Sequence, residues 1–217
     1  MLTRSILFAV ALTSFVSAAS AAPNYQIVLN GSVHDVELDK EYKVPLAEGG
    51  EDVSFTVRVK EDQTFSDSFL SFSYKKKFSL TESGIHEGVN QVLLNSALGT
   101  IVIVQEYSTV NPSGLTSFFL NELTSEERAA GFTQTTKPYE KKLSDTLTLK
   151  GIEAVVEKGE QKIQYIVAAH GTDKTGILIA VRLDQEFSKS DGELIENFWN
   201  TLSIKLGSST SSEEPKS

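Results

Sequence analysis

The sequence predicts an α+β fold in which helices pack on an antiparallel β-sheet, with a small all-β module on the N-terminal side. Residues 146–183 hold three runs with alternating apolar positions, separated by turns that contain glycine. Residues 190–202 then place apolar side chains at helical spacing. Residues 25–59 contain only short alternating segments, which predicts strands without a helix.

The centre of the predicted sheet is formed by strands at residues 146–156, 161–170 and 177–183. We expect Gly151 to interrupt the first of them, and we expect turns at residues 158–160 and 171–176. Each of the last two strands has one regular apolar face, yet Ile166 and Leu178 make the opposite faces partly apolar as well. Something is therefore expected to cover part of both faces.

The C-terminal helix is indicated by Ser190 and Glu193, which have the spacing of a capping box. Its apolar stripe consists of Leu194, Ile195, Phe198, Trp199 and Leu202. Burial of such side chains contributes roughly 1.5–3 kcal/mol each. This stripe is therefore predicted to pack on the sheet as core, and not to form an active site.

Residues 1–21 have the pattern of a secretory signal peptide: Arg4, an apolar run over residues 6–15, and small residues up to Ala22. The apolar run is shorter than the ~20 residues that a membrane span needs. We therefore expect cleavage after Ala21 and an exported product, periplasmic or secreted. Removal of Arg4 would change the formal net charge from −9 to −10, because residues 1–21 contain no acid.

The composition excludes several functions. An acidic chain is not suited to nucleic acid, because phosphate contacts need clustered lysine and arginine. The sequence has no cysteine, which excludes disulfides, thiol catalysis and cysteine-ligated metals. The exported chain must therefore rely on its hydrophobic core for stability.

Residues 22–62 are predicted to form a β-rich module, and the sequence leaves open whether it folds independently. Asn30-Gly31 is a strong hairpin signal, and strands are expected at residues 25–29, 33–38, 42–46 and 53–59. Asn30-Gly31-Ser32 is also a glycosylation sequence, but we favour its role as a turn.

Residues 63–206 are predicted to form the main domain, and residues 207–217 a disordered tail. Residues 60–67 look like a polar connector that leads into strands at 69–74, 91–94 and 100–105. The lysines at residues 75–77 end the first of these strands. The unbroken apolar run at residues 101–104 is typical of a strand that is buried on both faces.

The first helix is predicted to start at Asn111 and Pro112, with the asparagine as cap and the proline at the first helical position. Its stripe is expected to contain Leu115, Phe118, Phe119, Glu122 and Leu123. A short second helix is expected at residues 125–130, ending at Gly131.

Four segments carry a resemblance to a known family: FLSFSY (69–74), GTIVIV (99–104), GIEA (151–154) and FWNTLSI (198–204). In this order of elements the chain resembles the PsbP-like superfamily, which is named for an extrinsic subunit of photosystem II and also contains a small Ran-binding nuclear-import factor. The resemblance covers about two-thirds of the chain and leaves out residues 25–59. It implies an antiparallel sheet sandwiched by helices, and a binding or assembly role without catalysis. No functional residue can be carried over, because the family has no shared catalytic motif.

No residue is predicted to be catalytic, to hold a cofactor or to ligate a metal. Residues 173–176 (DKTG) match the phosphorylation motif of P-type ion pumps, but they fall in a predicted hairpin turn, where these residue types are ordinary. His34, His86 and His170 lie far apart in sequence, without metal-ligand spacing. Lys75–Lys77 and Lys141–Lys142 are interpreted as solvated strand ends.

The sequence therefore favours an exported, non-enzymatic binding or accessory protein with an unidentified protein partner and no cofactor. One alternative is a carrier of a small apolar ligand between sheet and helices, suggested by Ile166 and Leu178. Another is a hydrolase whose carboxylates assemble only in space. An exposed apolar patch would favour the first function, an enclosed apolar pocket the second, and a cleft with convergent acids the third.

Overall fold

The computed structural model describes residues 25–29, 31–45 and 52–205. The predicted signal peptide and the predicted C-terminal tail lie outside these residues. The chain divides into two compact units, residues 1–59 and residues 60–217, and each is described by itself.

The described residues of the first unit form two antiparallel hairpins. One pairs β1 (Tyr25–Leu29) with β2 (Ser32–Val36), and the other pairs β3 (Glu41–Pro45) with β4 (Asp52–Thr56). Gly31 has a φ of +83°, which a hairpin turn requires and glycine adopts without strain. The rings of Tyr42 and Phe55 stack at 5.8 Å, and the Tyr42 hydroxyl accepts a hydrogen bond from the Glu37 backbone N–H at 2.7 Å. The prediction of a small all-β region is confirmed.

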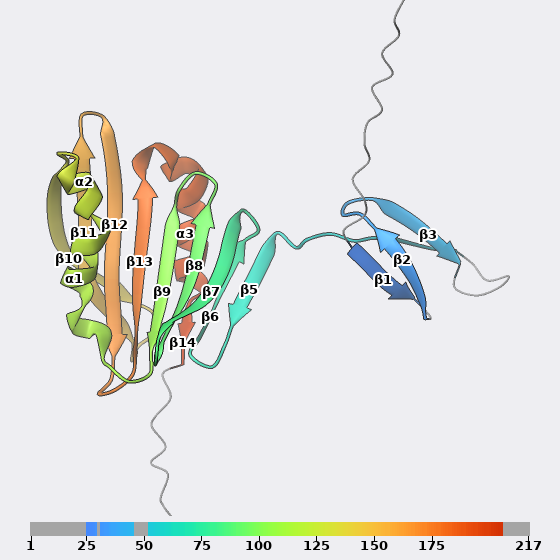
Figure 1. The fold of residues 1–217 in the computed structure, drawn as a ribbon, viewed down its shortest axis with the longest axis horizontal. Helices are drawn as coiled ribbons and strands as arrows, with labels where there is room; N and C mark the ends of the chain where they lie inside the picture. The colour runs from blue at the N-terminus through green and yellow to red at the C-terminus, as the bar shows by residue number, and fades with distance from the viewer. Residues whose placement is uncertain (1–24, 30, 46–51, 206–217) are drawn as a thin grey trace, which may run out of the picture. The chain divides into compact units, whose positions relative to one another are not determined.

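The second unit is built on a seven-stranded antiparallel sheet with the strand order β10-β11-β12-β13-β9-β8-β7. Its strands are β7 (Phe78–His86), β8 (Val89–Ser96), β9 (Ile101–Tyr107), β10 (Thr133–Lys142), β11 (Thr148–Lys158), β12 (Gln161–Gly171) and β13 (Gly176–Asp184). Helices cover both faces (Figure 1): α1 (Thr116–Leu123) and α2 (Ser125–Ala129) on one, and α3 (Ser188–Thr201) on the other. This is the predicted α+β sandwich.

A smaller three-stranded sheet, in the order β14-β6-β5, lies on the α3 side. It contains β5 (Asp62–Ser66), β6 (Leu70–Lys75) and β14 (Ser203–Ile204). The prediction of a polar connector at residues 60–67 is therefore wrong. Phe65 is buried and stacks on Phe72 at 5.2 Å, while the residues on either side of it in β5 face solvent. A strand with a single buried side chain leaves almost no periodic signal in the sequence.

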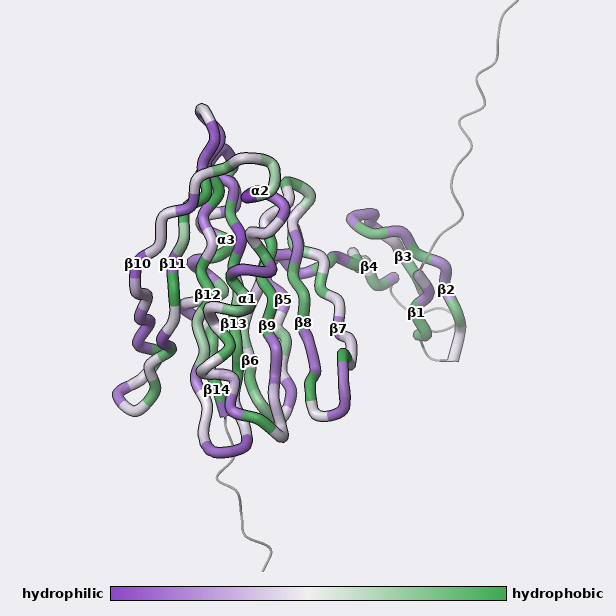
Figure 2. Tube along the Cα trace, turned by 60° about the vertical axis from the view of Figure 1, so that its left-hand side comes forward, coloured by the Kyte–Doolittle hydropathy of each residue, from purple (hydrophilic) through white to green (hydrophobic). Residues whose placement is uncertain are grey.

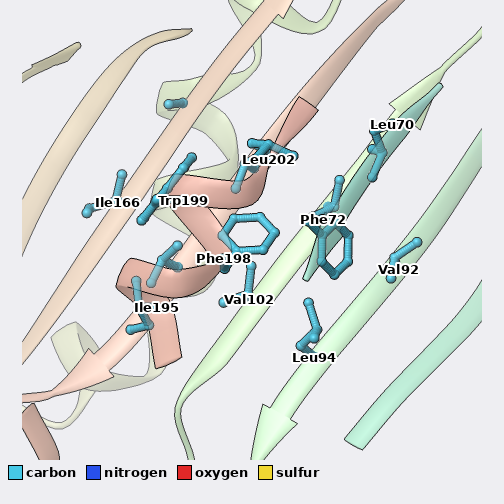
Figure 3. Close-up of a cluster of buried hydrophobic side chains, with 14 of the residues drawn as sticks. Leu70, Phe72, Val92, Leu94, Val102, Ile166, Ile195, Phe198, Trp199 and Leu202 are labelled. Atoms are coloured by element: carbon cyan, nitrogen blue, oxygen red, sulfur yellow. The ribbon is translucent and has the colours of Figure 1, made fainter. Parts of the chain in front are cut away.

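The core on the α3 side joins the helix to both sheets (Figure 3). The Phe198 ring packs edge-on against Phe72 of β6 at 5.0 Å and against Trp199 at 5.2 Å. All five residues of the predicted stripe are buried in this cluster, together with Ile166 of β12. The prediction that this helix packs on the sheet is confirmed.

The predicted capping box of this helix is wrong. The helix begins at Ser188, directly after the 3₁₀ turn η2 (Gln185–Phe187), so Ser190 already has helical backbone and its hydroxyl donates to the Phe187 carbonyl at 3.0 Å. The turn is capped by Asp184, whose carboxylate accepts from the Glu186 N–H at 3.1 Å. In the first turn of α3, buried Asp191 accepts a hydrogen bond from Ser96 Oγ at 2.6 Å, which ties the helix to β8.

The start of the other helical segment agrees with the sequence, and its predicted stripe agrees at Leu115, Phe119 and Leu123 but not at Phe118 and Glu122. The Asn111 side chain accepts from the Ser113 N–H at 2.9 Å and caps the 3₁₀ turn η1 (Pro112–Gly114). Phe118 of α1 is 63% exposed, and Leu120 is buried in its place. Pro112, Thr116, Leu120 and Thr124 are buried at four-residue intervals, so the packed face of α1 lies to one side of Phe118 and Glu122.

Two neighbouring strands at one edge of the seven-stranded sheet, β11 and β10, also differ from the prediction. Gly151 does not interrupt β11; a Cβ atom there would lie 1.9 Å from the Val167 carbonyl oxygen, so the close approach of β12 requires glycine. The edge strand β10 was not predicted. It is mostly hydrophilic and contains Pro138, as an edge strand can, and Figure 2 shows its contrast with the more apolar β11.

The core position of Trp199 gives the first testable prediction. Trp199 is 7% exposed, so Trp199→Ala should lower the free energy of unfolding by about 3–5 kcal/mol through lost burial and a cavity. Phe118→Ala removes an aromatic ring from the exposed face of α1 and should change it by less than ~0.5 kcal/mol. Urea unfolding of both variants compares the two positions. Similar losses in both would contradict the assignment of core and surface.

Candidate functional site

Two of the hollows among the described residues of the second unit lie on opposite faces of the seven-stranded sheet and bring together polar side chains from several elements. The first, which we call the α2 groove, has a volume of about 200 Å³. Its lining residues are Ile101, Ile103, Leu123, Glu126, Glu127, Tyr165, Ala180, Val181 and Arg182. It lies at the border between the helices and the bare part of the sheet, because α1 packs on β11 and β12 while Ile101 and Ile103 of β9 remain only partly buried.

The polar end of the α2 groove is a hydrogen-bonded cluster of three side chains. The Tyr165 hydroxyl donates to Glu127 Oε1 at 2.6 Å, and Arg182 Nε donates to the Tyr165 oxygen at 3.2 Å. Arg182 also donates from Nη1 to the Gly99 carbonyl at 2.9 Å, which fixes the guanidinium. Burial and the bond to Glu127 raise the pKa of Tyr165 although Arg182 acts to lower it, so the tyrosine stays a hydrogen-bond donor.

The other oxygen of this glutamate, Glu127 Oε2, is buried and has no hydrogen-bond partner among the described residues. An unsatisfied buried acceptor of this kind costs about 1–3 kcal/mol. A ligand that brings an N–H or O–H group to this oxygen would recover that cost. The α2 groove is therefore an apolar hollow whose lining includes a residue with an unsatisfied acceptor.

The second hollow, which we call the acid pocket, has a volume of about 270 Å³ and lies on the α3 face. Its lining residues are Asp67, Glu82, Ser83, Gly84, Asn90, Gln91, Val92 and Glu106. The sheet register puts Gly84 opposite Asn90, and Asn90 opposite Glu106, so these residues form a row across β7, β8 and β9. Asp67 reaches the same place from the turn between β5 and β6.

Asp67 and Glu106 differ in their hydrogen bonds and in their burial. Asp67 Oδ1 accepts hydrogen bonds from the backbone N–H groups of Phe69 at 2.7 Å and Leu70 at 2.8 Å. Glu106 is only 4% exposed. Burial, the hydrogen bond with Asp67 and the charges of Asp67 and Glu82 raise the pKa of Glu106 from 4.5 to about 8. At neutral pH Glu106 is therefore mostly protonated and can donate its proton to Asp67.

None of the residues in the two polar clusters was predicted from the sequence to be a site residue. Glu106 could have been found, because residues 102, 104 and 106 alternate towards the core face and a glutamate in that position is unusual. Its meeting with Asp67 and Glu82 depends on the pairing of distant segments, which no local spacing records. The partly apolar faces at Ile166 and Leu178 are covered: Ile166 lies in the α3 core, and Leu178 in the core beneath α1.

The residues that were considered from the sequence are not brought together. Asp173 is exposed in the β12–β13 hairpin turn, where the Thr172 N–H donates to the Thr175 carbonyl at 2.8 Å. His34 lies on β2 of the first unit, whereas His86 ends β7 and His170 lies on β12. Lys75 and Lys76 pair with Asp62 and Glu61, and Lys142 pairs with Asp145 at 2.7 Å.

Two general features of the described residues bear on function. Within the described ranges, His, Asp and Glu side chains nowhere gather in a group of three or more that could hold a metal ion. No helix in the same ranges combines the length and the apolar character needed to cross a bilayer.

No family model matches this sequence, and no curated protein does. Among solved structures the chain is similar to the solution structure of cyanobacterial PsbP (CyanoP) from Synechocystis sp. PCC 6803, with 12% sequence identity and a TM-score of 0.46 over 69% of this chain and 95% of that chain. It is also similar to a crystal structure from Bacteroides thetaiotaomicron VPI-5482, with 10% identity and a TM-score of 0.39; 67% of this chain matches about half (49%) of that chain. The resemblance to PsbP-like proteins is thus found again, as a likeness of fold.

The state of Glu106 gives a prediction about stability. Because its folded pKa is raised, the contribution of Glu106 to the stability of the wild type should fall as pH rises from 4.5 to about 8 and then level off. Glu106→Gln can still donate to Asp67 and cannot ionise. Between about pH 5.5 and about pH 8.5 the variant should therefore gain roughly 2–4 kcal/mol relative to the wild type. Urea unfolding at both pH values measures this gain, and a pH-independent difference would argue against a protonated Glu106.

Proposed function

We propose that this protein is an exported, non-enzymatic binding protein that docks a protein partner through the α2 groove. The observation that carries the proposal is the combination of an apolar groove beside a bare stretch of sheet with one unsatisfied buried acceptor, Glu127 Oε2. Interfaces commonly centre on an anchor side chain in such a pocket, surrounded by a flatter contact area.

The size of the α2 groove favours a side chain over a free ligand. Small-molecule sites usually measure about 300–1,000 Å³. The α2 groove, at about 200 Å³, is smaller than that and is open to the sheet surface. The partly buried Ile101 and Ile103 of β9 extend the apolar surface beyond the groove, where a partner backbone can lie.

The chemistry of the polar end narrows the anchor to an aromatic residue with a hydrogen-bond donor. Tyrosine and tryptophan combine a large apolar body with an O–H or N–H group, and both are enriched at the centres of interfaces. The ring would lie against Ile103, Leu123 and Ala180 while the donor reaches Glu127 Oε2.

Two alternatives are less well supported. A carrier of an apolar ligand between sheet and helices was suggested by Ile166 and Leu178, and both of these are occupied by core packing. A carboxylate hydrolase could use the acid pocket, which is a cleft with convergent acids. Retaining glycosidases, however, hold their two carboxyl groups about 5–5.5 Å apart around the bond that breaks. Asp67 and Glu106 are within hydrogen-bonding reach of each other, which does not fit the glycosidase arrangement.

A matched pair of glutamine substitutions tests the docking proposal. Glu127→Gln keeps an oxygen for Tyr165 and places an NH₂ group where the unpaired acceptor was. Glu122→Gln makes the same change at an exposed position of α1. Titration with N-acetyl-tryptophanamide, followed by NMR, should shift the signals of Ile103 and Leu123 with a Kd of about 1 mM, the expected range for a ligand of this size.

Binding of this probe should weaken about tenfold in Glu127→Gln and remain unchanged in Glu122→Gln, since one good hydrogen bond to a charged group is worth about 1.5 kcal/mol or more. The same variants can then be compared in capturing a partner from the native exported fraction. Shifts that are equal in both variants, or that fall outside the groove, would count against the docking site.

Export is the second part of the proposal. We propose residues 1–21 as a cleaved signal peptide, residues 22–62 as the small β module, residues 63–206 as the sandwich domain and residues 207–217 as a disordered tail. Mass spectrometry of the protein from the periplasm or medium should then give a chain that starts at Ala22. A chain that retains Met1 in that fraction would disprove the cleavage.

A further inference from the structure

The acid pocket takes no part in the docking proposed above, since it lies on the opposite face of the sheet. It brings together three carboxyl groups from separate elements: Asp67 from the β5–β6 turn, Glu82 from β7 and Glu106 from β9. The described residues that line it include no lysine, arginine or histidine. Its negative charge is therefore not balanced within the pocket.

The deepest member of this group is incompletely satisfied. Glu106 is buried, and its Oε1 atom has no hydrogen-bond partner among the described residues. A buried carboxyl group is stable only if it is neutralised or paired, because the ionised form loses its hydration. In the free protein a shared proton provides the neutralisation. A cationic ligand entering the pocket could provide it instead.

The shape of the pocket and the number of its hydrogen-bond acceptors select the kind of cation. An ammonium group is compact and has three N–H donors, which match carboxyl groups that converge from three elements. Val92 supplies an apolar wall for a methylene stem, and Asn90 supplies an amide group at the rim. The described residues form no cluster suited to a metal ion, so a metal fits less well.

We propose that the acid pocket is a binding site for a primary ammonium group, in which Asp67 and Glu106 accept its hydrogen bonds and Glu82 adds negative charge. The group can belong to a free alkylamine or to a lysine side chain of a peptide. Both present the same chemistry to the pocket.

Binding should be coupled to loss of the proton from Glu106. Its pKa of about 8 means that the group is mostly protonated at neutral pH, and it must ionise to accept the ammonium. The charged groups that face it are Asp67 and Glu82. In the sheet, Glu106 lies between the apolar Ile177 of β13 and the neutral Asn90 of β8. The next titratable side chain along this row of paired residues is His170 of β12, two strands away from Glu106. The affinity should therefore fall about tenfold from pH 7 to pH 6.

Isothermal titration of the mature chain with n-butylammonium chloride, at constant ionic strength, tests the site. We expect saturable binding in the millimolar range. Titration at pH 7 in buffers of different ionisation enthalpy should report the release of about one proton for each cation bound. Tetramethylammonium has the same charge and no N–H donor, and should bind at least tenfold more weakly. N-acetyl-lysine methylamide, compared with butylammonium, separates a peptide source from a free amine.

Three variants test whether the binding of butylammonium depends on the acid pocket. Glu106→Gln should lose both at least tenfold in affinity and the proton release, and its unfolding curve reports that it is folded. Gly84→Ala narrows the pocket without a clash, because the added Cβ would lie 3.9 Å from Asn90 Oδ1, and it should also weaken binding. Glu127→Gln, in the α2 groove, should bind butylammonium as the wild type does.

Each remaining outcome would overturn the proposal. Equal binding of tetramethylammonium would show charge screening alone, and unchanged binding in Glu106→Gln would place the amine elsewhere. The absence of saturable binding would rule out the site. None of these results bears on the α2 groove, because the two sites are probed by different ligands and different variants.

Discussion

The structure depends on one constraint: the central strands β12 and β13 are apolar on both faces, so each face of the sheet must be covered. Tyr165 and Leu178 face α1, whereas Ile166 and Ile179 face α3. Burial of such side chains contributes roughly 1.5–3 kcal/mol each, which exceeds the gain from any single surface ion pair. Without cysteine to cross-link the chain, this two-sided burial is the main source of its stability.

On each face of the seven-stranded sheet, the elements that pack against it cover only part of its width. The candidate sites lie at the edges of these covered areas. On one face α1 packs on β11 and β12, and the α2 groove opens towards β9. On the other, the acid pocket is enclosed by the turn between β5 and β6 and by β7, the last strand of the sheet. At both borders a glutamate, Glu127 or Glu106, has one buried oxygen without a partner among the described residues. The same geometry that completes the core thus leaves unsatisfied polar groups at its margins.

The sequence predicts those parts of the structure in which each residue's neighbours are determined locally. Alternation along β12 and β13 places every side chain on its correct face, and the stripe of α3 is correct because an uninterrupted helix keeps its period. The stripe of α1 fails at Phe118 because the buried face is centred on Thr116 and Leu120, and a threonine at the centre of that face weakens the apolar pattern. β5 was missed because only Phe65 is buried in it. The acid pocket could not be predicted, since Asp67 and Glu106 meet only through the packing of two sheets.

Glu106 shows why a group that destabilises the fold can still indicate a function. The bond to Asp67 needs a donor, and a glutamine amide at the same position would supply one at every pH without any cost of ionisation. A leucine or valine would continue the apolar alternation of Val102 and Val104 and bury more surface. What only the carboxyl group adds is the ability to become negative when a positive charge arrives. That ability has no role in packing, and it is the property that an ammonium ligand in the acid pocket would use.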